Sequence, residues 1–154
     1  MAITRLGHFI AKFEGSGVPE GEFGSDVEGT KPIFFDVGSN KRKMAKALRH
    51  CHKHMGDHAT ILHDEDGLPN WIKKHLKLQR IEAQGTWECH PANFYGWEAE
   101  KVVAVTVGDH IMELITRAKT NLSVILVGKD FEYEETKEYF QQAADKGLIE
   151  VVSL

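Results

Sequence analysis

The chain has 154 residues, a net charge of −4 and two cysteines, which suits one domain that buries a core without disulfides. Cys51 and Cys89 lie far apart and have no C-x-x-C partner, so we expect reduced thiols in a reducing compartment. The acidic balance argues against a broad nucleic-acid footprint, with residues 41–49 as a local exception. The sequence has no signal-peptide pattern and no membrane-spanning apolar run, which predicts a cytoplasmic protein without membrane contact.

Residues 1–30 are expected to form an N-terminal arm, because they are rich in glycine and acidic residues. Such a composition cannot hold a long helix and offers little apolar surface. Residues 6–13 alternate in a way that suits an edge strand, although a mobile tail explains them equally well. An arm of this kind could reach onto a neighbouring subunit of a homo-oligomer, which would suit a non-catalytic assembly or interaction protein such as a phage-type component or inhibitor.

The single domain is expected over residues 31–154, and it begins with a buried strand at 32–38 that ends in glycine. A helix follows, because Met44, Leu48, Cys51 and Met55 recur at spacings of four, three and four while cations cover the opposite side. Gly56 ends this helix. A second strand is expected at 58–63, followed by an acidic turn at 64–67.

The second half of the domain alternates strands and helices. Residues 68–97 have no clear period apart from a short helix at 71–76. After them we expect a strand at 101–108, a helix carrying Ile111, Leu114, Ile115 and Ala118, a strand at 121–128, a helix at 134–146 and a closing strand at 148–152. This alternation predicts a three-layer α/β fold, Rossmann-like or flavodoxin-like, with a mostly parallel sheet flanked by helices.

Three of the expected strands end in glycine, and in parallel sheets ligands bind beyond the carboxyl ends of the strands. If the three turns converge, their backbone amides would line one pocket. No G-x-G-x-x-G or P-loop motif is present, so each turn could equally be a tight strand-to-helix connection. We expect a small-molecule nucleotide as ligand and no resident cofactor. The candidate binding residues are Asp36, Gly38, Ser39, Asn40, Gly108, Asp109, Gly128 and Lys129.

Histidine is abundant, with nine residues in the chain. His50 and His54 have the i, i+4 spacing of two metal ligands on one helix face, and with Asp64 they suggest a metal-dependent hydrolase as a further alternative. No H-E-x-x-H motif is present and Arg49 and Lys53 would repel a cation. A solvated helix face explains the histidines as well, so no metal site is expected.

Glu98 follows Trp97, and a carboxylate beside an aromatic wall can stabilise the cationic transition state of N-glycosidic cleavage. A surface position for both residues is the simpler explanation. Cys89 is the better reactive thiol of the two, because Cys51 falls on the apolar stripe, where burial raises a thiol pKa.

The segment Trp97-Glu-Ala-Glu-Lys101, with Asp109 to Lys119 and the strand Asn121-Leu-Ser-Val-Ile-Leu-Val-Gly128, resembles bacterial TIR-like domains. Pro32-Ile-Phe-Phe and Gly147-Leu-Ile-Glu-Val-Val are compatible with the first and last strands of that family. The resemblance implies a flavodoxin-like fold and either cleavage of the nicotinamide–ribose bond of NAD or binding of a related nucleotide. Glu98 would then be the catalytic glutamate of a nucleotide glycohydrolase.

Overall fold

The computed structural model describes residues 31–55, 59–63, 70–71, 74, 82–85, 99–108, 111–115, 118–128 and 131–154. The expected edge strand at 6–13 and most of the short helix expected at 71–76 lie outside these residues. Within the described part of the chain, no helix combines the length and apolarity needed to cross a bilayer.

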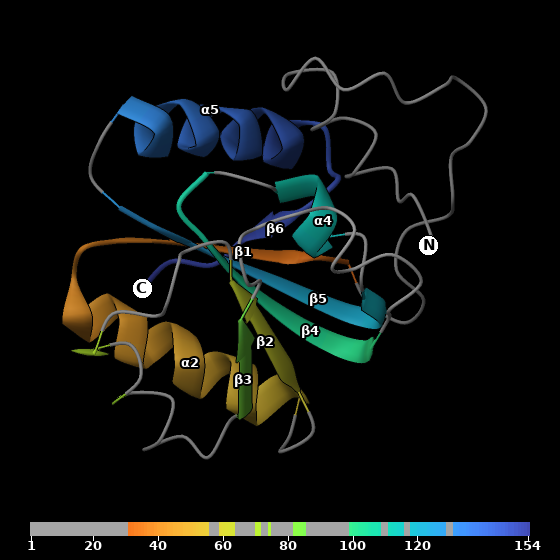
Figure 1. The fold of residues 1–154 in the computed structure, drawn as a ribbon. Coiled ribbons are helices and arrows are strands. Elements are labelled where there is room, and N and C mark those ends of the chain that lie inside the picture. The colour runs from red at the N-terminus through yellow and green to blue at the C-terminus, as the bar shows by residue number, and fades with distance from the viewer. Residues whose placement is uncertain are drawn as a thin grey trace.

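Six strands form one parallel sheet in the order β3-β2-β4-β5-β1-β6 (Figure 1). Every strand pairing in this sheet is parallel. The strands span β1 Ile33–Gly38, β2 Thr60–His63, β3 Glu82–Gly85, β4 Ala99–Thr106, β5 Ala118–Val127 and β6 Glu150–Val151.

Helices cover both faces of the sheet, which gives the expected three-layer α/β fold (Figure 1). Helix α2 (Lys41–Met55) packs on one face, and helices α4 (Ile111–Ile115) and α5 (Phe131–Asp145) pack on the other. Each face of the sheet has its own hydrophobic core, and successive residues of a strand point into one core and then the other. Phe34 lies in the core under α4 and α5, whereas Phe35 lies in the core under α2. This period of two follows from the pleat of a strand that is buried on both faces.

Helix α2 agrees with the apolar spacing in the sequence. Met44, Leu48 and Cys51 are buried against the sheet, and Ala47 joins them. Asn40 begins the helix by accepting hydrogen bonds from the backbone N–H groups of Arg42 at 3.0 Å and Lys43 at 3.1 Å. This N-cap satisfies two donors that would otherwise have no partner in the first turn.

The second half of the domain shows the expected alternation, with element boundaries that differ from the expected ones by up to three residues. Helix α4 ends at Ile115, and Ala118, which was expected on that helix, is the first residue of β5. The strand propensity of the following residues and the pairing of Ala118 with Ala99 on β4 override the helical spacing there. Helix α5 packs through Phe140 and Ala143, and Phe140 stacks on Phe34 with ring centroids 4.7 Å apart.

Strand β3 was not anticipated from the sequence. Its four residues, Glu-Ala-Gln-Gly, include no β-branched or aromatic side chain. The strand exists because it lies in register beside β2, where Thr60 pairs with Glu82 and His63 with Gly85. Such a short edge strand depends on its neighbour for backbone hydrogen bonds and leaves no pattern of its own in the sequence.

Candidate functional site

The three glycine turns lie side by side at the carboxyl ends of their strands. Strands β4, β5 and β1 are neighbours and run parallel, so Gly108, Gly128 and Gly38 follow or end adjacent strands on the same side. All three glycines have positive φ angles, of 108°, 122° and 62° respectively. These angles favour glycine and allow the chain to leave each strand abruptly.

The amides of two of these turns are occupied within the protein. The Gly128 N–H donates to the Gly38 carbonyl oxygen at 3.1 Å, and the Gly108 N–H donates to Thr106 Oγ1 at 3.0 Å. The expectation that glycine amides would line a pocket therefore needs correction, because these two groups already have partners. These two N–H groups are therefore not available to a ligand.

The chain leaves β1 and β5 toward opposite faces of the sheet. After β1 the chain enters α2 on one face, and after β5 it enters α5 on the other (Figure 1). Adjacent parallel strands with diverging connections form a topological switch point, and ligands of open α/β sheets bind in the crevice outside it. Here the switch point lies between β1 and β5, which pair from Ile33 to Gly38.

Asp36, Tyr133 and Lys137 form a polar cluster at this switch point. Asp36 points toward α5, where it accepts a hydrogen bond from the Tyr133 hydroxyl and pairs with Lys137 Nζ at 3.3 Å. The Asp36 side chain keeps 28 % of its surface exposed. A carboxylate at this exposure can accept further hydrogen bonds from a ligand hydroxyl group.

Tyr133 lies against both glycine turns. A Cβ atom on Gly38 would lie 3.3 Å from the Tyr133 hydroxyl, and one on Gly128 would lie 3.4 Å from Tyr133 Cβ. Tyr133 as a whole is 8 % exposed. Burial, reinforced by the hydrogen bond to Asp36, raises the pKa of Tyr133 above its ordinary value. Tyr133 therefore stays protonated and donates to Asp36 at neutral pH.

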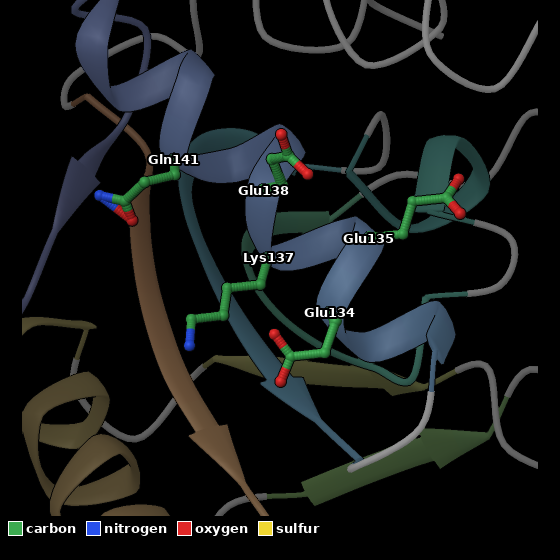
Figure 2. A pocket seen from close by; sticks show the side chains of 5 residues that line it. All are labelled: Glu134, Glu135, Lys137, Glu138 and Gln141. Atoms are coloured by element: carbon green, nitrogen blue, oxygen red, sulfur yellow. The ribbon is translucent and has the colours of Figure 1, made fainter.

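A surface hollow of about 390 Å³ lies beside this cluster on α5. Figure 2 shows Lys137 extending from α5 over strand β1, with Glu134 directed to the same side of the helix. Three of the five lining side chains are carboxylates, so the hollow repels phosphate groups. The described residues that line it are Glu134, Glu135, Lys137, Glu138 and Gln141.

The first turn of α2 supplies positive charge on the other side of the switch point. Lys41, Arg42 and Lys43 are all exposed, and Ser39 is exposed in the turn before them. Asn40 was expected to offer hydrogen bonds to a ligand, but its side-chain oxygen caps α2 instead. The cations of this turn are thus better placed than Asn40 to attract a phosphate.

Glu98, Asp109 and Lys129 lie outside the described residues. The described neighbour of Glu98 is Ala99, which begins β4 at its amino end. Gly108 follows the carboxyl end of the same strand. Because β4 has eight residues, its first and last residues lie about 23 Å apart. The switch point therefore lies at the carboxyl ends of the strands, whereas Ala99 lies at the amino end of β4.

Among the described residues, His50 and Cys51 take part in packing rather than in a metal or thiol site. His50 makes an edge-to-face contact with Phe35, with ring centroids 5.2 Å apart, whereas the His54 side chain and Asp64 lie outside the described residues. Over the part of the chain that the structure describes, no three His, Cys, Asp or Glu side chains gather as a metal site would require. Cys51 is a free thiol whose burial raises its pKa to about 12, and Cys89 lies outside the described residues.

Sequence reasoning singled out Asp36 and the glycine turns as candidates but not Tyr133 and Lys137, the two residues of α5 that contact Asp36. Both missed residues lie in the first half of α5, where they have the appearance of ordinary helix surface positions. Comparison with known proteins adds no assignment, since neither a protein-family model nor a curated protein sequence matches this chain.

Proposed function

We propose that this protein binds a nucleotide at the switch point between β1 and β5. The observation that carries the proposal is the placement of Asp36 between two charged elements, with Lys137 on α5 to one side and the basic first turn of α2 to the other. The Asp36 carboxylate accepts hydrogen bonds from the sugar hydroxyl groups, as carboxylates do in dinucleotide-binding α/β domains.

The phosphate groups lie toward the first turn of α2 in this proposal. Helix N-termini favour anions, and Lys41 and Lys43 add full positive charges there. The acidic hollow on α5 disfavours the opposite orientation, because Glu134 and Glu138 would repel a phosphate. Specificity for nucleotides over nucleosides therefore depends on α2, whereas recognition of the sugar depends on Asp36.

Cleavage of the nicotinamide–ribose bond by Glu98 is not part of this proposal. Ala99 lies at the amino end of β4, and the switch point lies at the carboxyl ends of the strands. One ligand would therefore have to span the length of β4 to contact both. Binding at the switch point and cleavage at Glu98 are therefore separable, and one assay can distinguish them.

The test measures binding of ATP, AMP, NAD and adenosine by isothermal titration calorimetry, with thermal unfolding as a second readout. A ligand present at one hundred times its Kd should stabilise the folded protein by about 2.7 kcal/mol. We expect Asp36→Asn to weaken binding of all four ligands, and Lys41→Gln with Lys43→Gln to weaken ATP more than adenosine. Asp145→Asn, an exposed carboxylate at the far end of α5, is the matched control and should bind as wild type.

Two results would overturn the proposal. The first is the absence of binding by the wild type at millimolar concentrations of all four ligands, and the second is equal binding by Asp36→Asn. Incubation with NAD forms a further arm. Release of nicotinamide that disappears in Glu98→Gln, together with unchanged NAD binding by Asp36→Asn, would contradict binding at the switch point.

A further inference from the structure

The outer face of α2 carries a straight line of positive charge. Arg42, Lys46, Arg49 and Lys53 follow one another at spacings of four, three and four residues, which places them on one face of the helix. All four are exposed. Met44, Leu48 and Cys51 occupy the opposite, buried face, so the line points directly away from the sheet. We name these four cations the α2 stripe.

The α2 stripe has no internal neutralising partner among the residues that the structure describes. Helix α2 contains no acidic residue, and Asp36 at the end of the adjacent strand pairs with Lys137 of α5 instead. Like charges three and four residues apart destabilise a helix by about 0.2–0.5 kcal/mol per pair. A chain with a net charge of −4 thus concentrates unpaired positive charge on one helix despite a cost to its stability.

The surroundings of the α2 stripe indicate what kind of surface it fits. An interfacial membrane helix exposes large apolar side chains beside its cations, and protein interfaces have an apolar centre. Val151 on β6 is the exposed large apolar side chain within the described residues, and it does not lie on α2. Among the described residues the row of cations has no exposed apolar neighbour. Such a row fits phosphate groups, which Lys and Arg side chains bind without reading the bases.

We infer that the α2 stripe binds the phosphate backbone of double-stranded nucleic acid without reading its sequence. Arg42 and Lys53 are eleven residues apart, or about 16 Å along the helix axis, and a duplex of that length carries about ten phosphates on its two strands. Helix α5, on the opposite face of the sheet, carries Glu134, Glu135 and Glu138. This charge asymmetry orients the protein with α2 toward a polyanion. The inference is separable from the nucleotide site, because only Arg42 of the four stripe residues lies in the first turn of α2, whereas Lys46, Arg49 and Lys53 lie beyond it.

The experiment measures binding of the full chain to a labelled 20-base-pair DNA duplex by fluorescence anisotropy between 50 and 200 mM salt. For four phosphate contacts we expect log Kobs to fall against log[salt] with a slope of about −3.6, a loss of about 100-fold in affinity over this range. Two duplexes of unrelated sequence should bind equally. Phosphatidylserine vesicles represent an anionic membrane surface, and poly-glutamate represents an acidic polypeptide. Binding to each is compared with binding to DNA.

Two triple variants separate the placement of charge from its total amount. Lys46→Gln, Arg49→Gln and Lys53→Gln remove most of the α2 stripe, while Lys31→Gln, Lys74→Gln and Lys146→Gln remove three exposed lysines elsewhere. Each triple variant changes the net charge from −4 to −7. We expect the first to lose about 2.7 units of the salt slope and the second to retain the wild-type slope. Thermal unfolding verifies that both variants fold, since only exposed side chains change.

Four results would overturn the inference: no duplex binding by the wild type at 50 mM salt, equal weakening by both triple variants, tighter binding to the vesicles or to poly-glutamate than to DNA, or salt-sensitive self-association in sedimentation runs without DNA. The two proposals can fail separately, because the stripe triple variant retains Asp36 and Lys41. Loss of nucleotide binding alone would leave the DNA inference unchanged.

Discussion

Asp36 at the end of β1 accepts a hydrogen bond from the hydroxyl of Tyr133 on α5, although the two residues are 97 positions apart in the chain. This contact ties the carboxyl end of β1 to the first turns of the helix that follows β5. The same ring lies over the turns at Gly38 and Gly128. Tyr133 therefore joins the two strands between which the switch point opens, and Asp36 is held in place by α5.

Replacing Tyr133 with phenylalanine should test this connection. Tyr133→Phe removes the hydroxyl while keeping the ring against the glycine turns, so we expect the free energy of unfolding to fall by about 1 kcal/mol. Asp36 retains Lys137 and access to solvent, which limits the loss. Urea denaturation followed by circular dichroism measures the change. An unchanged midpoint would mean that the Tyr133 hydroxyl contributes no net stability.

Gly38 and Gly147 form a matched pair for testing the packing of Tyr133. Both have positive φ angles, of 62° and 74°, but a Cβ on Gly38 meets the Tyr133 hydroxyl at 3.3 Å whereas one on Gly147 meets nothing within 4 Å. We expect Gly147→Ala to cost about 1 kcal/mol from backbone conformation alone. Gly38→Ala should cost more, because the tyrosine must also move. Equal losses in urea denaturation would contradict this prediction.

The double variant Gly38→Ala with Tyr133→Phe identifies the cause of the larger loss. Phenylalanine lacks the oxygen that the new Cβ would approach, so the cost of Gly38→Ala should be smaller in the Tyr133→Phe background than in the wild type. The coupling between neighbouring residues of this kind lies in the range of about 0.5–3 kcal/mol. Strict additivity would show that the two positions do not interact.

The sequence was sufficient to predict those features that depend on local patterns. The apolar spacing of Met44, Leu48 and Cys51 predicted α2 and its buried face, and the glycine after each β-branched run predicted the abrupt strand ends. The convergence of Gly38, Gly108 and Gly128 followed from the expectation of a parallel sheet, since parallel strands place their carboxyl ends on one side.

Features that depend on contacts between distant segments could not be predicted from the sequence. The position of β1 between β5 and β6 arises from which strands pair, and no local pattern encodes that choice. Tyr133 looks like an ordinary residue of an acidic helix until β1 brings Asp36 beside it. Ala118 has helical spacing with Leu114, yet the pairing of β5 with β4 makes it a strand residue.

Asn40 offers a test of the cap of α2 that leaves the α2 stripe unchanged. Asn40→Ala removes the acceptor for the N–H groups of Arg42 and Lys43 and should lower the free energy of unfolding by about 1 kcal/mol. Asn40→Asp keeps an acceptor and adds negative charge beside three cations, so its stability should equal or exceed that of the wild type. Thermal and urea unfolding measure both changes. A loss in Asn40→Asp as large as in Asn40→Ala would contradict the capping role.

Cys51 should be unreactive in the folded protein. Burial raises its pKa from 9.0 to about 12, so only about one thiol in 10,000 is ionised at pH 8, and the thiolate is the reactive form. We expect a Cys89→Ser variant, which leaves Cys51 as the single thiol, to react with a disulfide reagent at pH 8 only at the rate of unfolding. Rapid reaction without denaturant would contradict this prediction.

The same pKa predicts how stability depends on alkaline pH. The folded state holds the Cys51 proton more tightly than the unfolded state, so the stabilising contribution is complete below pH 9 and is lost as the pH rises toward 12. The slope attributable to Cys51 should approach about 1.3 kcal/mol per pH unit in this interval. This slope is isolated by comparing the Cys89→Ser variant with the double variant Cys89→Ser, Cys51→Ala. The loss of packing in Cys51→Ala lowers the free energy of unfolding equally at every pH, whereas release of the Cys51 proton changes its slope with pH. Parallel pH profiles would mean that the Cys51 thiolate is tolerated in the folded core.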